Sequence, residues 1–266
     1  MYISIIVRKM IKSLSPTEQM IYSKLYPKRV ITTMDVFRIL KDRHRSVDYL
    51  TNLREKGFVQ KIRRGVYAIL PPDAVGGSFL PDKFLVAGKL RDRYYISHHS
   101  ALELHGVAES TFNTVYISSP TYQRSLTHQG VTYRIVTTKH FFGMEEIQYK
   151  GEQLLASDLE KTVLDCIKRI KYAGGLEELL KSLSNIPYVN YEKLWRYLKK
   201  FDEKVLYHKT GFLLETLKRT PVSFLNKIKG ELGGTVYYLY GKKNCVYNRD
   251  WNLMIPENLD ELVRFA

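Results

Sequence analysis

Residues 43–70 decide the fold of the N-terminal part of the chain, and they read RHRSVDYLTNLREKGFVQKIRRGVYAIL. In the first half of this stretch, Val47, Leu50 and Leu53 recur at the spacing of one helical face. We therefore expect a helix over about residues 44–56, with these three side chains directed toward a core.

Two β-prone runs follow this helix, which is expected to end at Gly57. The runs are residues 58–62 and 66–70, and the basic turn Arg63-Arg64-Gly65 separates them. A tight turn with glycine between two short strands predicts a β-hairpin whose tip carries two positive charges.

Two further helices are predicted upstream of this stretch. Residues 15–18 read SPTE, with a serine that can cap, a proline at the first helical position and a glutamate three residues after the cap. A second helix is expected to begin at Thr32 or Thr33. Three helices followed by a hairpin are typical of a winged helix-turn-helix.

The third helix and the hairpin carry the candidate DNA-contacting residues. A recognition helix inserts its N-terminal side chains into the major groove, where Arg and Asn bond to guanine and adenine edges. Cations on the wing bind phosphate or enter the minor groove. Asp42 and Asp48 oppose this interpretation, because they repel phosphates. The candidates are Arg43, His44, Arg45, Tyr49 and Asn52 on the helix, and Lys61, Arg63 and Arg64 on the hairpin.

The charge distribution agrees with a polyanionic partner. The chain of 266 residues has a formal net charge of +15. Residues 1–75 carry about 15 Lys and Arg against about 6 Asp and Glu, so over half of the excess lies in this basic block. Such an excess favours nucleic acid first and an anionic membrane surface second.

The composition and the positions of proline and glycine indicate the domain organisation. A hydrophobic content of 44% argues against disorder and suffices for one large domain or two ordinary ones. Two prolines and two glycines in residues 71–78 indicate a linker. We expect a winged helix-turn-helix over residues 1–72 and a larger mixed α/β (α+β) domain over residues 79–266.

The elements of the larger domain follow from its local patterns. Strands are expected at 114–118 and 131–136, and a hairpin is expected from residues 235–240 and 244–248 around Gly241. The expected helices are 79–91, 97–106, 158–172, 175–184, 190–200 and 203–219.

Three stretches of this domain carry residue types suited to chemistry. Residues 95–106 contain three histidines, but no partner pair completes a metal site, and helix capping explains the stretch. Asp158, Glu160 and Lys161 could form a nuclease site, whereas the same residues also suit a helix start followed by a Lys161–Asp165 pair. Residues 174–175 are two glycines without a phosphate-binding pattern, which indicates a helix stop.

In order along the chain, the stretches are KGFVQKIRRGVYAI, YYISHHSALELHGV, VYISSP, YRIVTTKHFFG and ASDLEKTVLDCIKRIKYAGGLEELLKSL. By order and spacing they resemble the AbiEi-type antitoxins, which are the transcriptional-regulator partners in AbiE toxin–antitoxin systems. The resemblance covers about residues 14–220, and residues 221–266 match less clearly.

This resemblance implies a winged helix that binds inverted repeats in the promoter of its own operon and represses it. It implies that the second domain counteracts a nucleotidyltransferase-like toxin, with direct contact left open. Eight positions match its motifs without an assigned chemical role: Ser100, Ala101, His105, Gly106, Asp158, Glu160, Thr162 and Asp165.

We therefore expect a DNA-binding regulator without enzymatic activity, cofactor or bound metal, acting as a monomer or homodimer on double-stranded DNA. Two cysteines and no apolar stretch of about 20 residues predict a cytoplasmic protein without a membrane partner, and the apolar residues 1–7 lack the features of a secretory signal. The alternatives are a DNA-targeted nuclease or other phosphodiester-acting enzyme, and a module whose basic surface meets acidic protein.

Overall fold

The computed structural model describes residues 14–264. The apolar opening at residues 1–7, which bears on the secretory-signal prediction, lies outside them. The chain divides into two compact units. Of the described residues, one unit contains 14–92 with the short segments 128–130 and 148–154, and the other contains the remainder up to residue 264. This division differs from the predicted boundary, because residues 79–92 belong to the first unit.

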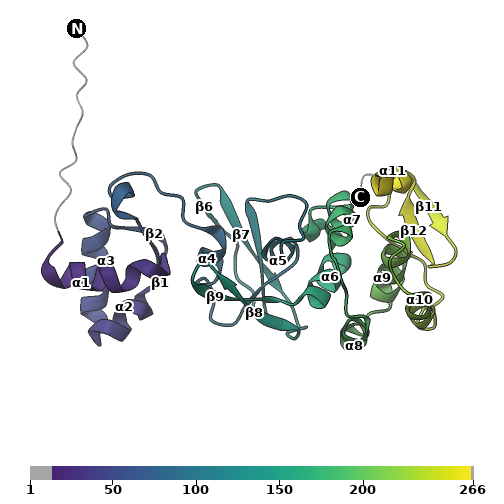
Figure 1. The fold of residues 1–266 in the computed structure, drawn as a ribbon, viewed down its shortest axis with the longest axis horizontal. Helices are drawn as coiled ribbons and strands as arrows, with labels where there is room; N and C mark the ends of the chain where they lie inside the picture. The colour runs from purple at the N-terminus through teal and green to yellow at the C-terminus, as the bar shows by residue number, and fades with distance from the viewer. Residues whose placement is uncertain (1–13, 265–266) are drawn as a thin grey trace, which may run out of the picture. The chain divides into compact units, whose positions relative to one another are not determined.

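The first unit contains a winged helix (Figure 1, purple to blue). Both predicted capping sites form: Ser15 and Glu18 make a capping box, and Thr32 makes another with Asp35. A three-stranded sheet with the order β1-β3-β2 closes the fold. In chain order the elements are α1 (Pro16–Leu25), β1 (Val30–Thr32), α2 (Thr33–Leu40), α3 (Arg43–Glu55), β2 (Val59–Arg63) and β3 (Val66–Ile69).

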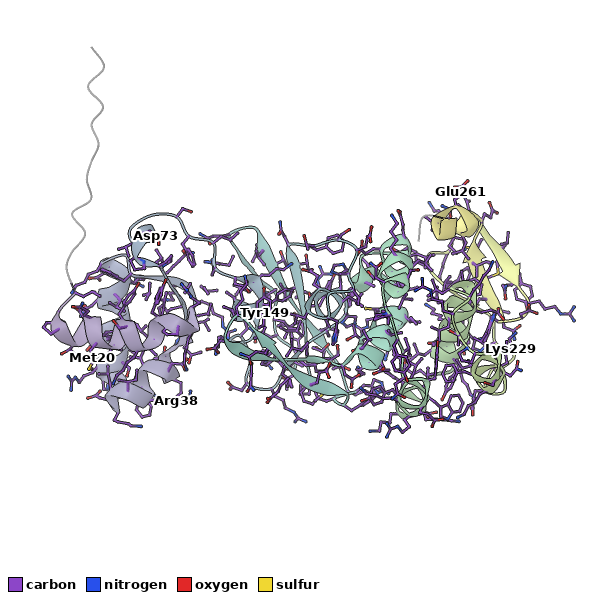
Figure 2. The ribbon with its side chains drawn as sticks, in the orientation of Figure 1. Met20, Arg38, Asp73, Tyr149, Lys229 and Glu261 are labelled. Carbon is purple, nitrogen blue, oxygen red and sulfur yellow. The ribbon has the colours of Figure 1, made fainter. Side chains whose placement is uncertain are left out.

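The winged helix has its own apolar core. Side chains of its three helices and of its sheet pack together, and Tyr22 also donates a hydrogen bond to the Leu70 carbonyl at 2.6 Å. Charged side chains such as Arg38, labelled in Figure 2, project from the surface. The fully or almost fully buried members include Ile21, Ile31, Val36, Leu50, Leu53 and Ile69.

The rest of the first unit is organised around Asp82. Its carboxylate caps α4 (Lys83–Ala87) and accepts hydrogen bonds from Tyr149 and Lys150. The predicted helix over 79–91 is therefore wrong in extent: α4 begins only after Asp82, and Gly88 caps its end.

A six-stranded mixed sheet follows, with the order β6-β7-β5-β4-β9-β8. β5 pairs in parallel with β7 and antiparallel to β4, and β4 pairs in parallel with β9. The predicted strands at 114–118 and 131–136 correspond to β5 and β7. The bounds are β4 (Tyr95–Ile96), β5 (Thr114–Ser119), β6 (Leu126–His128), β7 (Val131–Thr137), β8 (Met144–Tyr149) and β9 (Glu152–Ser157).

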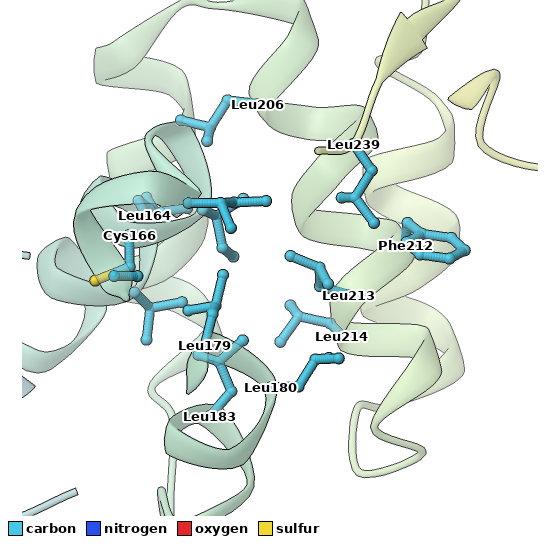
Figure 3. Packing of buried hydrophobic residues seen from close by; sticks show 14 of the residues in the cluster. Leu164, Cys166, Leu179, Leu180, Leu183, Leu206, Phe212, Leu213, Leu214 and Leu239 are labelled. Carbon is cyan, nitrogen blue, oxygen red and sulfur yellow. The ribbon is translucent and has the colours of Figure 1, made fainter. Parts of the chain in front are cut away.

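Helices of the second unit enclose its largest apolar core (Figure 3). Leu179, Leu180 and Leu213 are among the labelled side chains that meet there, and each is 0% exposed. The predicted 158–172 helix divides into α6 and a 3-10 turn. The helices are α5 (His99–Leu104), α6 (Leu159–Lys168), η3 (Ile170–Ala173), α7 (Leu176–Ser184), α8 (Tyr191–Phe201), α9 (Lys204–Thr216) and α10 (Val222–Lys229).

The predicted hairpin over 235–248 is wrong. β10 (Tyr237–Tyr238) and β11 (Cys245–Asn248) do not pair with each other, because β12 (Leu253–Pro256) lies between them. β12 is parallel to β10 and antiparallel to β11. The last helix, α11, spans Leu259–Arg264.

The structure thus confirms a winged helix-turn-helix followed by a larger mixed α/β part. Within residues 14–264, no helix combines the length and the apolarity needed to cross a bilayer.

Candidate nucleic-acid interface

The N-terminal end of α3 presents three basic side chains. Asp42 caps the helix by accepting a hydrogen bond from the Arg45 backbone N–H at 3.0 Å. The Ser46 hydroxyl donates to the Asp42 carbonyl at 2.5 Å and braces the same turn. Arg43, His44 and Arg45 are exposed around this start. The cap therefore orders the helix end that a recognition helix inserts into the major groove.

The buried face of α3 differs from the predicted one. Val47, expected in the core, is 48% exposed, whereas Tyr49, expected at the surface, is 6% exposed. Ser46 and Tyr49 pack inward beside Leu50 and Leu53. The Tyr49 hydroxyl donates to the Glu18 carbonyl of α1 at 3.2 Å, and burial raises the pKa of Tyr49. Tyr49 is therefore mainly a packing residue, and the small exposed part of it lines the groove that also contains Arg45 and Asn52.

Two other predicted residues line a groove instead of facing straight outward. Arg45 and Asn52 are exposed, and together with Asp48 they form one side of a groove whose opposite side includes Ser15 and Thr17 of α1. The Asp48 carboxylate therefore lies in the same groove as Asn52. Asp48 is able to accept a hydrogen bond from cytosine N4, although it repels phosphate.

The wing divides its basic residues between two roles. Lys61 and Arg64 are exposed, and Gly65 forms the tip with a positive φ of 80°. The register of β2 on β3 shifts between Lys61 and Arg63. Arg63 is half-buried, and its guanidinium donates to the Leu90 carbonyl at 2.6 Å. One guanidinium N–H of Arg63 is therefore bound to the protein's own backbone, which leaves this side chain less available to DNA than Lys61 and Arg64.

Three other cations of the winged helix have acidic partners in the described residues. Lys28 and Arg38 both pair with Asp35, and Lys56 pairs with Glu18 at 2.6 Å. By contrast, within residues 14–264 no ion pair engages the exposed cations Arg43, Arg45, Lys61 and Arg64. These four charges lie on the α3 start and on the wing, so positive potential remains where a duplex would dock.

Sequence reasoning missed Lys41. This residue ends α2 with a left-handed φ of 56°, and its side chain is exposed in the turn between α2 and α3. The signal that could have found it is its position in the turn directly before the recognition helix. Lys41 thus adds a cation next to Arg43.

The acidic motif of the second unit is structural in most of its contacts. Asp158 caps α6 by accepting from the Lys161 N–H at 2.9 Å, in agreement with the predicted helix start, and it also accepts from the Tyr197 hydroxyl at 2.7 Å. Glu160 accepts from the Asn190 N–H and pairs with Lys193. Burial penalises the Glu160 carboxylate, yet its hydrogen bonds to Asn190 and Lys193 hold the pKa of Glu160 below its usual range.

The other singled-out stretches have similar roles. Ser100 accepts a hydrogen bond from the Tyr116 N–H, and His105 bonds to the Ser157 carbonyl. Gly174 and Gly175 have φ values of 90° and 106°, which confirms the predicted helix stop before α7. In the described part of the chain, no group of three or more His, Cys, Asp or Glu side chains could hold a metal ion.

Fold and surface define the class of protein: a winged-helix protein with a larger α/β unit attached. No family model matches the chain, and no curated protein matches it either. Among solved structures, the chain is similar to the crystal structure of the RV2827C protein from Mycobacterium tuberculosis. The TM-score is 0.67 and the sequence identity is 16%, with 96% of each chain covered. At this identity the likeness shows a shared fold.

Proposed function

We propose that this chain is a cytoplasmic, DNA-binding transcriptional regulator. It places the start of α3 in the major groove and sets the wing against the adjacent backbone. The observation that carries this proposal is the set of exposed cations Arg43, Arg45, Lys61 and Arg64, which lack acidic partners in the part of the chain that the structure describes. A polyanion supplies the missing partners, and the net charge of +15 attracts it from a distance.

The proposed contacts divide into positioning and reading. Lys61 and Arg64 on the wing bind phosphates, which fixes register without carrying sequence information. Arg43, Arg45 and Asn52 supply the donors that recognise purine edges, and His44 lies beside them. Tyr49 and Arg63 are excluded from this set, because both are engaged inside the protein.

The biological role that we propose is that of an antitoxin which represses its own operon. This part rests on the ordered motifs that resemble the AbiEi-type antitoxins. The regulator would bind inverted repeats as a homodimer or as two adjacent monomers, and it would counteract a nucleotidyltransferase-like toxin. Co-expression with the neighbouring reading frame tests this role: a toxic neighbour that this chain neutralises supports it, and a neighbour without toxicity contradicts it.

The nuclease alternative gains no support from the contacts. Asp158 and Glu160 are bound to a helix end, a tyrosine hydroxyl, a backbone N–H and Lys193. A two-metal nuclease needs carboxylate oxygens that are free to bind divalent cations.

The wing provides the sharpest test of DNA binding. A fluorescently labelled duplex from the upstream region is titrated with the full chain over a series of salt concentrations. Each lost phosphate contact lowers the slope of log K against log salt by about 0.9. We expect Lys61→Gln with Arg64→Gln to lower this slope by about 2 and to weaken binding similarly on all sequences.

The matched control removes two exposed cations elsewhere in the same fold, through Lys24→Gln with Arg54→Gln. Lys24 lies on α1 and Arg54 lies in the last turn of α3, away from its N-terminal end. This control changes the net charge equally, so it should leave the slope near that of the parent. An unchanged slope in the wing variant, or an equal loss in the control, would contradict the proposed docking face.

A further inference from the structure

A narrow pocket lies in the second unit, and none of the residues proposed to bind DNA lines it. It occupies about 270 Å³, open mouth included. Its floor is the face of the six-stranded sheet formed by β5 and β7, and its other wall is the C-terminal end of α6. Ser118, Thr138, Asp165, Lys168 and Arg169 are among the lining residues. Strand register explains the floor: Ser118 pairs with Val136, and both line the pocket.

The charges around this pocket leave a positive excess. Asp165 is neutralised by Lys161 at 2.6 Å, and Lys168 is paired with Glu203 at 2.6 Å. Arg169 is exposed and makes no ion pair within residues 14–264; its guanidinium lies 5.5 Å from the centre of the Tyr172 ring.

A second guanidinium approaches the same ring. Arg134 of β7 lies 5.7 Å from the centre of the Tyr172 ring and likewise has no acidic partner in the described residues. Tyr172 stacks on Tyr116, with ring centres 5.0 Å apart. The aromatic pair therefore holds two unpaired arginines beside the pocket, where planar guanidinium donors suit an oxyanion.

His98 adds a neutral donor to the lining. It is 3% exposed, and burial lowers the pKa of His98 to about 4, so the ring is neutral at physiological pH. The Ser118 hydroxyl donates a hydrogen bond to Ser97 Oγ. The Ser97 hydroxyl is then left to donate its own proton to His98 Nδ1, and the two heavy atoms are 2.9 Å apart. This chain of hydroxyls places the ring proton on Nε2, which has no hydrogen-bond partner in the described residues.

The backbone at His98 is strained. Its φ of 53° and ψ of −138° lie in a region that non-glycine residues rarely adopt. A histidine kept in such a conformation next to a polar pocket indicates that the imidazole is needed there. Strain of this kind collects at ligand sites, where the surrounding structure enforces it.

We propose that this pocket binds the phosphate group of a small ligand. Arg169, Arg134 and His98 Nε2 supply donors, and the hydroxyls of Ser118 and Thr138 lie on the floor. A cation is disfavoured, because the carboxylate in the lining, Asp165, already binds Lys161. The enclosed part of the pocket is only about 20 Å³, which is room for about one water molecule, so a phosphate group would lie in the open mouth beside Arg169 with any attached group outside.

Isothermal titration calorimetry of the full chain with inorganic phosphate tests this inference, with sodium chloride at matched ionic strength as the reference. We expect saturable binding of one phosphate per chain that falls at least tenfold in Arg169→Gln. Arg249→Gln is the matched control, because Arg249 is exposed in the turn between β11 and β12 and does not line the pocket. Lys61→Gln with Arg64→Gln should also retain binding, which separates this site from the DNA face.

Two further titrations identify the source of the phosphate. Equal affinity for inorganic phosphate and adenosine monophosphate supports free phosphate as the ligand. A tenfold preference for the nucleotide supports a phosphate ester whose organic part contacts the Tyr172 side of the mouth. Absence of saturable binding for both, or equal binding by the parent and Arg169→Gln, overturns the proposal.

Discussion

The exposed face of the winged helix and the buried first turn of α6 both carry basic side chains, but in opposite environments. On α3 and the wing, Arg43 and Arg64 are exposed and unpaired within the described residues. Within α6, Lys161 is 0% exposed, and its ammonium lies 2.6 Å from the Asp165 carboxylate and 3.2 Å from the Tyr95 hydroxyl. A charge without a partner is available to a ligand, whereas a charge enclosed with its partners serves the fold.

The surroundings of Lys161 explain how such a charge persists. Its ammonium lies 4.7 Å from the Phe201 ring centre and 5.2 Å from the Phe142 ring centre. Burial lowers the pKa of Lys161, and Asp165 acts in the opposite direction. Removal of either partner would therefore leave an uncompensated buried charge. Removal of an exposed cation on α3 leaves no such buried charge.

The largest expected effect comes from Lys161→Met. The substitution leaves the Asp165 carboxylate buried without its cation, and we expect a loss of about 3–5 kcal/mol in the free energy of unfolding. Urea denaturation of the full chain, followed by tryptophan fluorescence, measures it.

The double variant Lys161→Met with Asp165→Leu is the control for this prediction. It replaces the ion pair by apolar side chains of similar volume and should recover most of the loss. If the single variant were as stable as the parent, the buried pair would contribute nothing and the contrast with α3 would fail.

A smaller effect is expected from the pH dependence of His98. Burial lowers the pKa of His98 to about 4, with Lys161 and Arg169 acting in the same direction and Asp165 opposing them. The His98 side chain binds a proton below about pH 6.5 in the unfolded chain but only near pH 4 in the folded chain. Its contribution to the free energy of unfolding is therefore fully present above about pH 6.5 and is lost as the pH falls toward 4. From pH 8 to pH 5 the loss is about 2 kcal/mol.

The variant His98→Gln isolates this contribution. Its stability should change less than that of the parent over the same pH interval, in a buffer without phosphate. Carboxylates with lowered pKa values, such as Asp35, titrate at lower pH and contribute equally to both proteins. Identical pH profiles for the two proteins would show that His98 is free to charge in the folded state.

Local signals in the sequence predicted much of the winged helix. Ser15 and Glu18 cap one another within a single turn, and Gly57 follows α3 with a positive φ of 82°. Such features need only neighbouring residues, so a sequence pattern contains them. The buried face of α3 could not be predicted from neighbouring residues alone, because it depends on contacts with other elements. Buried Ser46 and the hydrogen bond from Tyr49 to α1 shift this face away from Val47.

Other departures from the sequence predictions depend on distant partners. Arg63 turns inward because Leu90 offers a carbonyl, and the predicted 235–248 hairpin is interrupted by β12, which comes later in the chain. The spacing of Lys161 and Asp165 predicted their pairing, but their burial depends on rings at Phe142 and Phe201. A four-residue spacing is identical on an exposed and on a buried helix face, so the pattern alone could not distinguish a surface pair from a core pair.

The smallest expected effect comes from Arg43→Gln with Arg64→Gln. Because neither side chain has an ionic partner within residues 14–264, we expect the free energy of unfolding to change by less than about 0.5 kcal/mol while DNA affinity falls. Lys56→Gln is the comparison variant, since it breaks the partly buried pair with Glu18 and should cost about 1 kcal/mol. Thermal unfolding and duplex titration of the three proteins separate stability from binding. A loss above about 1 kcal/mol in the arginine variant would mean that these charges stabilise the fold, and the distinction between ligand-binding and structural cations would then no longer hold.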